Sequence, residues 1–349
     1  MAEEFKSHRW WVTAFLIFAL LAFFPVISDP FRVALYGKYL SFAFVAVGIV
    51  LSWGYCGILS LGQGIFFGIG AYALAMFLKL EASAPDLPDF MIWSSVEALP
   101  IWWEPFRSPF VTLLAILLLP VLIAFPFSYL IFRKRVSGVY FAILTLALAL
   151  MVTVLLVGSQ GETGGANGIT DYKTALGIDV VSDEARSKLY YLLLPTLAVV
   201  VVFVRFLTTS RFGKVLIAIR DREDRVRFSG YNTALIKAVT LSISCVLASI
   251  GGAMFVLFTG LITPQLAGAV ASVEMVIFAA FGGRLSALGA VVAAFVVGGA
   301  KSLLSETFPE LWLFFLGSLF LVVTAILPNG LAGLFQAKLF VSLGRRTDG

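Results

Sequence analysis

Residues 210–231 read SRFGKVLIAIRDREDRVRFSGY and carry nine of the chain's 25 basic and 20 acidic side chains. Long apolar runs lie on both sides of this segment. A charged side chain at the centre of a bilayer costs about 2.5–3.5 kcal/mol on insertion scales, so nine of them cannot lie in lipid. The segment must therefore face water between membrane spans, where a short charged helix is available to a soluble partner.

The composition of the 349 residues is that of a membrane protein. Hydrophobic residues make up 60% and charged residues 13%, the mean hydropathy is +1.00, and a soluble domain carries about 25% charged residues. The net charge of +5 arises from short loops between apolar runs, where membrane orientation explains it and nucleic-acid binding is not indicated. Cys56 and Cys245 lie in apolar runs without CxxC spacing, so no disulfide or metal site is predicted.

Runs of about 20 apolar residues are long enough to cross a membrane. The sequence contains about ten, at 11–28, 33–52, 55–79, 110–132, 138–157, 189–207, 235–258, 268–282, 286–304 and 311–327. We predict an all-α polytopic integral membrane protein, with one transmembrane domain over 1–335 and a tail at 336–349. A cleaved signal peptide is a weaker interpretation of the first run, because no small-residue cleavage site follows it.

The charges of the loops alternate in sign from one side of the predicted membrane to the other. With the N-terminus inside, the cytoplasmic loops hold Arg133 to Arg135, the charged segment 210–231 and Arg284, whereas the outer loops 80–109 and 158–188 are acidic. This is the positive-inside pattern. It predicts that residues 210–231 and both termini are cytoplasmic. The run 268–282 is short, and a re-entrant segment is the alternative there.

The outer loops contain structure other than spans. Residues 83–109 hold five Pro and three Trp, which favours extended chain and a flat interfacial helix. Residues 158–170 hold five Gly and include Asn167, which predicts a tight irregular loop. This loop is either a solvent-exposed connector or a contact for the solute or for a delivery protein.

The run WGYCGILSLGQGIFFGIGAY, residues 53–72, is apolar but rich in glycine. Ser60, Gly64 and Gly68 recur every four residues, so one face of a helix here would carry only small side chains. Together with Gly57, this pattern predicts close packing against another helix. In one interpretation this run is a helix–helix seam across which Gln63 finds a partner. In the other, a broken helix lines a translocation path, to which Tyr55, Ser60 and Gln63 offer polar groups.

Glu274, in SVEMVIFAAFGGR, is an ionisable residue within a predicted span, near its outer end. Such a residue is a functional candidate by default. The structural alternative is that the carboxylate reaches water or pairs with a nearby donor.

Two signatures and several shorter stretches occur together along the chain. The signatures are GYCGILSLGQGIFFGIGAY at 54–72 and SRFGKVLIAIRDREDRVRFSGYN at 210–232. The other stretches are RVSGVYFAILTLAL at 135–148, GANGITDYK at 165–173, SVEMVIFAAFGGR and GAVVAAFVVGGAKSLLSETFPELWLFFLG within 272–317, and LPNGLAGL at 327–334. From about residue 33 to 335 the chain resembles the permeases of ABC importers for branched-chain amino acids and urea. The stretches PDFM, GAKS and FPELWLFFLGSLFLVVTAILP resemble the urea-type permeases more.

The resemblance implies a permease subunit that works with a second, homologous permease as a heterodimer, two cytoplasmic ATPases and an external binding protein in a bacterial inner membrane. It implies urea or a short-chain amide as solute. The chain contains no G-x-x-x-x-G-K-[ST] loop, so ATP and Mg are expected on partner subunits, and this chain is expected to hold no cofactor. Residues 210–231 are expected to form the coupling helix that docks on the ATPase. The candidate coupling residues are Arg211, Lys214, Ile219, Arg220, Asp221, Glu223 and Arg227.

Four alternatives are weighed against this assignment. A branched-chain amino acid is the other solute within the family, and residues 210–231 are otherwise a merely solvated loop. An ion-coupled secondary transporter is expected to show carboxylates or His within its spans, but the only His is His8, outside them. An enzyme is not indicated, because the chain has neither HExxH nor GxSG, and no catalytic residue is predicted.

Overall fold

A computed structural model describes residues 8–308 except 173 and 181, together with residues 311, 314, 315, 317, 318, 321 and 330–333. The prediction of an all-α membrane protein is confirmed, because eight described helices are long and apolar enough to cross a membrane. These helices are α1 (His8–Ile27), α2 (Pro30–Ile49), α3 (Gln63–Ser83), α5 (Pro109–Arg133), α6 (Val139–Gly158), α8 (Asp183–Thr209), α10 (Thr233–Thr259) and α12 (Ala287–Thr307). Helix α11 (Ala269–Gly282) is shorter, and most of the predicted span 311–327 lies outside the described residues.

The remaining elements are short and lie mainly in the loops. They are η1 (Val50–Tyr55), α4 (Asp89–Trp93), η2 (Glu104–Arg107), α7 (Gln160–Thr163), η3 (Gly165–Asn167), β1 (Thr174–Ala175), β2 (Ile178–Asp179), α9 (Arg211–Phe228) and η4 (Pro264–Ala267). Strands β1 and β2 pair antiparallel as a two-stranded hairpin, with Ala175 opposite Ile178.

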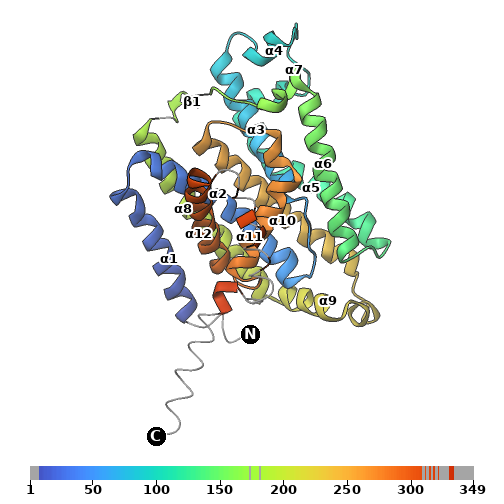
Figure 1. The fold of residues 1–349 in the computed structure, drawn as a ribbon. Coiled ribbons are helices and arrows are strands. Elements are labelled where there is room, and N and C mark those ends of the chain that lie inside the picture. Colours follow the sequence, from blue (N-terminus) through green and yellow to red (C-terminus); the bar gives the residue numbers. More distant parts are fainter. Residues whose placement is uncertain are drawn as a thin grey trace.

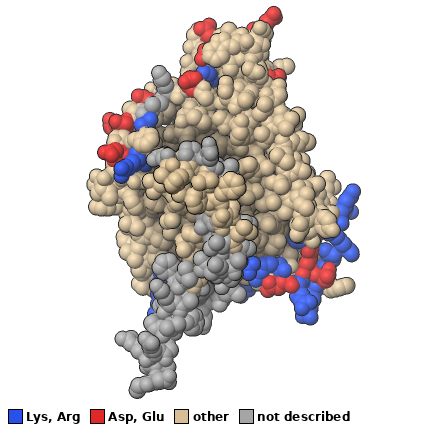
Figure 2. Space-filling model, viewed as in Figure 1, with Lys and Arg blue, Asp and Glu red and all other residues tan. Residues whose placement is uncertain are grey.

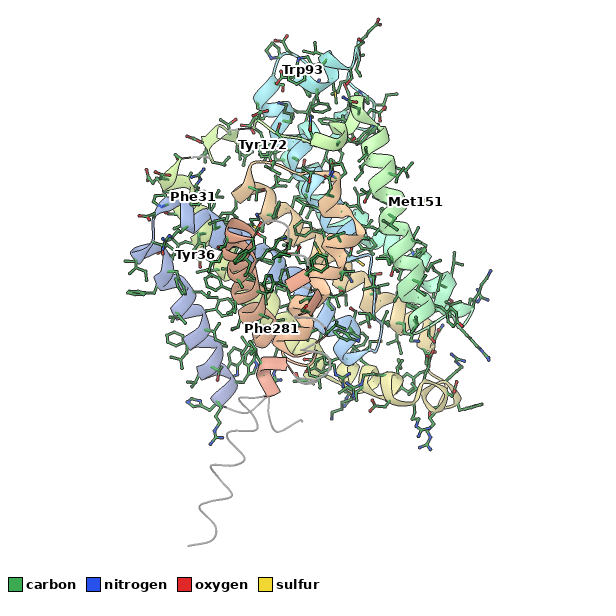
Figure 3. All side chains as sticks on the ribbon, in the orientation of Figure 1. Phe31, Tyr36, Trp93, Met151, Tyr172 and Phe281 are labelled. Carbon is green, nitrogen blue, oxygen red and sulfur yellow. The ribbon has the colours of Figure 1, made fainter. Side chains whose placement is uncertain are left out.

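Helices α2, α3 and α10 form the centre of the bundle, and α1, α5 and α6 lie around it (Figure 1). In the spanning window of α2, 78% of the residues are buried, against 6% in α1. Apolar side chains on the outer helices point away from the protein, as Met151 does on α6 (Figure 3). Because these side chains would face water in a soluble protein, their exposure is consistent with lipid around the bundle.

Glycine allows α3 and α10 to approach each other backbone to backbone. A Cβ added at Gly70 of α3 would lie 1.9 Å from the carbonyl oxygen of Ser249, and one added at Gly252 of α10 would lie 1.9 Å from that of Phe67. No side chain fits into these gaps. The seam between the two central helices therefore depends on small residues, as in other membrane bundles.

The two ends of the bundle differ in structure and charge. One end carries α4, α7 and the hairpin, and the opposite end carries α9, which lies across the bundle (Figure 1). Charged side chains gather at these ends, and the flank between them holds few on the face shown (Figure 2). Within the outer-loop end, Trp103 is fully buried and donates a hydrogen bond to the carbonyl of Glu162 at 3.0 Å. The two outer loops thus pack against each other.

The predicted span over residues 55–79 is not one continuous helix, as the broken-helix interpretation of this run expected. Helix α2 continues into η1 and ends at Tyr55, and α3 begins only at Gln63. Gly57 has a φ of +76°, a left-handed conformation that a helix does not allow. Ser60 therefore lies before the helix and does not share a helical face with Gly64 and Gly68. We call residues 54–62 the helix break.

Candidate functional site

Helix α9 is an amphipathic helix with one face against the bundle. Ser210 caps its start, accepting a hydrogen bond from the backbone N–H of Phe212 at 3.2 Å. Leu216 and Ile219 are buried on the side that faces the other helices. The helix is kinked at Arg222, whose φ and ψ of −151° and 76° are not helical. One face of α9 is thus held by the membrane domain, and the other is free for a partner.

Arg220 connects α9 to the helix break. Its Nη1 donates a hydrogen bond to the carbonyl oxygen of Gly54 at 2.7 Å, and its Nε contacts Asp221 at 3.0 Å. Its aliphatic stem lies over Gly57, where an added Cβ would come 2.9 Å from Cγ of Arg220. The break leaves the Gly54 carbonyl without the continuous helix that would otherwise satisfy it, and a charged donor takes that place.

Glu223 connects α9 to α10. Its carboxylate accepts hydrogen bonds from Lys237 at 2.6 Å, Arg227 at 3.0 Å and Thr233 at 3.1 Å. Burial alone would raise the pKa of Glu223, but the hydrogen bonds from Lys237 and Thr233 and the charges of Lys237 and Arg227 hold the pKa below its ordinary value. The carboxylate is therefore a firm second anchor of α9 on the membrane domain.

The predicted coupling residues divide into two groups. Ile219 is buried, and Arg220, Glu223 and Arg227 make the contacts within the chain described above. Arg211, Lys214 and Asp221 are exposed. The exposed face also includes Arg225 and Phe228, whose ring is 92% exposed and was not among the predicted residues.

The helix break also contacts the turn between α11 and α12. A Cβ at Gly54 would lie 1.7 Å from the carbonyl oxygen of Arg284, so the two backbones touch. Tyr55 donates a hydrogen bond from its hydroxyl to the carbonyl of Leu285 at 3.1 Å. The break, α9 and the α11–α12 turn consequently meet at one point near the end of the bundle that carries α9.

The other predicted residues of the Gly-rich run lie at or just after the break. Gln63 is fully buried and donates from Nε2 to the hydroxyl of Ser244 at 3.1 Å, while its Oε1 has no hydrogen-bond partner among the described residues. The hydroxyl of Ser60 accepts from the backbone N–H of Gly62 at 3.3 Å. A Cβ added at Gly64 would lie 2.6 Å from the hydroxyl of Ser272, and one added at Gly68 would lie 2.6 Å from the Cβ of Ala267.

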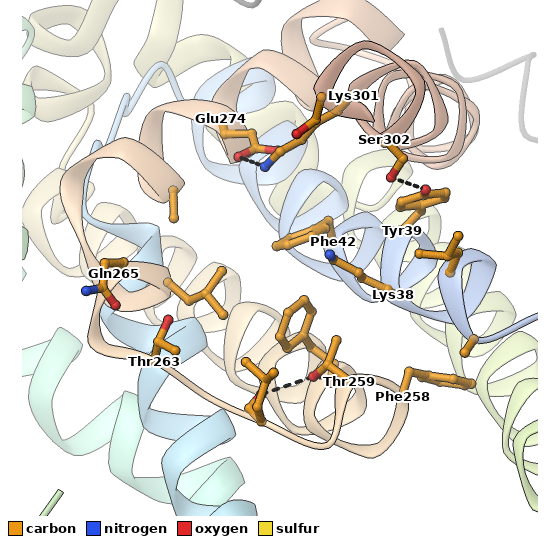
Figure 4. Close-up of a pocket in the computed structure, with 18 of the residues that line it drawn as sticks. Lys38, Tyr39, Phe42, Phe258, Thr259, Thr263, Gln265, Glu274, Lys301 and Ser302 are labelled. Carbon is orange, nitrogen blue, oxygen red and sulfur yellow. Dashed lines mark hydrogen bonds and ion pairs between the residues drawn. The ribbon is translucent and has the colours of Figure 1, made fainter. Parts of the chain in front are cut away.

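A pocket of about 740 Å³ opens between α2, α10, α11 and α12 toward the outer-loop end. Polar groups line one part of it and aromatic rings another (Figure 4). The polar or charged lining residues include Lys38, Tyr39, Thr259, Thr263, Gln265, Glu274, Lys301 and Ser302.

Glu274 and Lys301 form an ion pair in the wall of this pocket. Nζ of Lys301 lies 2.8 Å from Oε1 and 2.7 Å from Oε2 of Glu274, whose side chain is only 8% exposed. Lys38 points into the same space from α2 and interacts electrostatically with both (Figure 4). Beside them the hydroxyls of Tyr39 and Ser302 are hydrogen-bonded. The pocket thus contains one carboxylate and two ammonium groups within the membrane span, and Arg186 of α8, which pairs with Asp183, also lines it.

Aromatic rings close the inner end of the pocket. Phe42, Phe255 and Phe278 line it, and the ring centroid of Phe42 lies 5.4 Å from that of Phe255 and 5.6 Å from that of Phe278. Phe67 stacks on Phe42 at 5.3 Å, one helical turn after Gln63. We call these four residues the aromatic floor. It extends from the pocket, which Phe42 lines, to Phe67 near the helix break.

The predicted pathway residues do not gather at one place. Glu274 lines the pocket, Tyr55, Ser60 and Gln63 lie at the helix break, and Asn167 is exposed on η3. Sequence reasoning missed Lys38 and Lys301. Each is an ionisable side chain inside a predicted span, the same signal that identified Glu274.

The bundle of apolar helices, the amphipathic helix α9 across one end and the pocket nearer the other end together define a multi-pass membrane transport subunit. Residues 32–324 match the family model described as "Branched-chain amino acid transport system / permease component". The chain belongs to this family, and it is therefore an ABC-type permease component and not itself an enzyme.

Two curated relatives are LivM proteins, each named as a permease protein of a high-affinity branched-chain amino acid transport system. The protein of Salmonella typhimurium (strain LT2) is 24% identical over 323 residues, which cover 86% of this chain and 70% of the relative. The protein of Escherichia coli (strain K12) is 24% identical over 322 residues, covering 86% and 69%. No solved structure matches the chain.

Proposed function

We propose that this chain forms part of the membrane pathway of a bacterial ABC importer for urea or short-chain amides, driven by ATP hydrolysis on separate subunits. The observation that carries the coupling to ATP is the position of α9. One face of this helix is anchored to the helix break and to α10 through Arg220 and Glu223, and the other is exposed charge. A helix held in this way transmits the displacement of a docked ATPase to the spans.

The proposed assembly is a heterodimer with a second, homologous permease, two cytoplasmic ATPases that hold ATP and Mg, and an external binding protein. We propose that the assembly lies in the bacterial inner membrane, with both termini of this chain in the cytoplasm. The acidic outer loops and the basic cytoplasmic loops support this orientation. The mixed charges on the exposed face of α9 favour a specific register on the ATPase more than raw affinity.

The proposed mechanism is alternating access. A solute enters the pocket from outside and stops at the aromatic floor, and movement of α9 displaces the helix break through the Arg220–Gly54 contact. Tyr55, Ser60 and Gln63 then offer the solute polar groups on the inner side. The unpartnered Oε1 of Gln63 supports this, because a buried acceptor without a donor is costly and an amide N–H would satisfy it.

The urea assignment rests on the stretches PDFM, GAKS and FPELWLFFLGSLFLVVTAILP. The names of the LivM relatives favour a branched-chain amino acid as the second candidate. A pathway with few fixed charges would favour urea over an amino acid, and the charges of the pocket weaken this reason for urea. Lys38, Glu274 and Lys301 show that charged groups do line a pocket between the spans.

A direct test reconstitutes the complete transporter in vesicles, with labelled urea, acetamide or leucine supplied with the binding protein and ATP on the ATPase side. ATP-dependent uptake of urea or acetamide, unaffected by collapse of the proton gradient, is expected. Uptake of leucine without either amide would overturn the solute assignment. Uptake that needs no ATP and stops with the proton gradient would overturn the ABC mechanism in favour of a secondary transporter.

A further inference from the structure

We propose that Glu274, Lys301 and Lys38 form a recognition subsite for a small uncharged amide at the outer entrance of the pathway. We call these three residues the pocket triad. This inference rests on the proposed function above and names the groups that select its solute. It is carried by the ion pair in the pocket wall and by the ammonium group beside it.

The ion pair is placed where packing alone does not explain it. Taking a carboxylate and an ammonium out of water costs several kcal/mol per ion, and apolar residues of similar volume often replace such pairs without loss of stability. Lys301 and Glu274 lie on α12 and α11 and face the pocket. A pair that fixed the two helices would serve equally well inside their contact, so its position at a cavity indicates binding.

The pair leaves hydrogen-bonding capacity unused. A carboxylate offers about four lone-pair positions on its two oxygens, and Lys301 occupies one on each oxygen. The remaining positions suit two N–H groups of one amide, as in a bidentate contact. Within the described part of the chain, Glu274 has no other hydrogen-bond donor.

Lys38 supplies the complementary donor. Its side chain is half-buried, lines the pocket and has no hydrogen bond or ion pair with any described residue. An ammonium group with three N–H donors in a desolvated wall requires an acceptor. The carbonyl oxygen of urea or acetamide provides one, so a single amide connects Glu274 to Lys38.

The existing ion pair, rather than the number of charges, favours an uncharged solute. Lys301 already pairs with Glu274, so the ammonium group of an amino acid would have to compete with Lys301 for that carboxylate, whereas its own carboxylate could pair with Lys38. The two ammonium groups at Glu274 would repel each other, and the low dielectric of a membrane span strengthens the repulsion. An amide engages the same atoms while leaving the Glu274–Lys301 pair intact. The flat ring of Phe42 at the inner end of the pocket offers an apolar surface to the planar solute.

The test measures initial uptake of urea and acetamide by the complete reconstituted transporter over a range of concentrations of solute-loaded binding protein. Glu274→Gln and Lys38→Gln are each expected to raise the half-saturating concentration of loaded binding protein at least tenfold. If passage of the solute through the subsite limits transport, each variant is expected instead to reduce the rate of uptake at least tenfold. Lys188→Gln is the matched control, because its pair with Glu184 is exposed on α8, and wild-type uptake is expected.

A charge-exchanged variant, Glu274→Lys with Lys301→Glu, separates recognition from folding. It keeps an ion pair between α11 and α12, so a purely structural pair predicts recovered uptake. The pocket triad predicts that the exchanged protein inserts and supports ATPase activity but still takes up amides at least tenfold less well. Recovered uptake, or wild-type uptake in Glu274→Gln and Lys38→Gln, would overturn the subsite.

The wild-type transporter distinguishes this inference from the proposed function. If it takes up neither urea nor acetamide, the proposed solute fails before any variant is compared. If it takes up both amides and the variants match the wild type, the solute stands and the subsite fails. Leucine uptake that depends on Glu274 and Lys38 would overturn the preference for an uncharged amide.

Discussion

Glu223 on α9, at one end of the bundle, and Glu274 in the pocket nearer the other end are both carboxylates paired with a lysine from a neighbouring helix. Glu223 accepts hydrogen bonds from Lys237, Arg227 and Thr233, which occupy three of the about four lone-pair positions of its oxygens. Among the described residues, Glu274 is hydrogen-bonded only by Lys301, and it faces a pocket. The difference lies in unused hydrogen-bonding capacity. The point where α9, the helix break and the α11–α12 turn meet is built as a closed joint, and the pocket is built to accept a molecule.

The largest effect is expected where the joint has no spare room. In Gly54→Ala the new Cβ would lie 1.7 Å from the backbone carbonyl oxygen of Arg284, which cannot rotate away as a side chain could. Overpacking in a well-packed core costs about 1–3 kcal/mol. We expect transport to be lost and the melting temperature of the purified complex to fall. Thermal unfolding in detergent and uptake in vesicles measure the two effects.

Gly299→Ala is the matched control on α12, because no atom of the described residues outside the adjoining stretch of α12 lies within 4 Å of the added Cβ. It is expected to retain transport and thermal stability. If Gly54→Ala were as active and stable as Gly299→Ala, the helix break would be adaptable, and the contrast between a closed joint and an open pocket would not hold.

The sequence predicted the general architecture because insertion in a membrane demands long apolar runs and leaves charge only at the ends. The position of residues 210–231 followed from this rule, since nine charged side chains have no place in lipid. The helix break did not follow. Ile58, Leu59 and Leu61 are as apolar as the helices around them, so hydropathy cannot show that they are non-helical, and only the glycines hinted at it.

The candidate site was predicted in part for a similar reason. Glu274 was found because a carboxylate in an apolar run is conspicuous. Lys301 follows it by 27 residues on another helix, and their contact depends on how α11 packs against α12. The internal role of Arg220 was also hidden, because charge on an amphipathic helix looks alike whether it contacts a partner or its own backbone.

Removing the contact between the joint and α9 is expected to have the second-largest effect. Arg220→Met removes the charged donor to the Gly54 carbonyl, and hydrogen bonds to charged groups contribute about 1.5–3 kcal/mol. We expect uptake to fall at least tenfold while the protein still inserts and binds its ATPase. Uptake is measured in vesicles with increasing amounts of ATPase, and more ATPase should not restore it.

Arg225→Met is the control on the same helix, because Arg225 is exposed. If Arg225→Met only weakens docking, a saturating concentration of ATPase should restore its uptake. The same concentration should not restore uptake in Arg220→Met. Recovery of both variants at saturating ATPase would mean that Arg220 also acts in docking and that the joint transmits no movement through Gly54.

A smaller effect is expected on the exposed face of α9. Phe228 is 92% exposed beside charged residues, and buried aromatic anchors commonly dominate protein interfaces. Phe228→Ser is expected to raise about tenfold the ATPase concentration needed for half-maximal uptake, without changing the maximum. Titration of the ATPase against reconstituted permease measures this. An unchanged midpoint would remove Phe228 from the docking surface.

The smallest effect is expected in the acid stability of the joint. The pKa of Glu223 is lowered in the folded protein, so its paired carboxylate stabilises the fold above its ordinary pKa of 4.5, and this contribution is lost as the pH falls through the lowered value. Glu223→Gln should therefore melt below wild type at pH 7, with the difference narrowing below about pH 4.5. Glu184→Gln is the control, because Glu184 pairs with Lys188 at a similar distance of 2.7 Å but is 80% exposed, where solvent screens the pair. If the melting temperatures of the two variants depended on pH in the same way, the partners of Glu223 would stabilise the fold no more than an exposed ion pair does. The joint at α9 would then resemble an ordinary solvated surface.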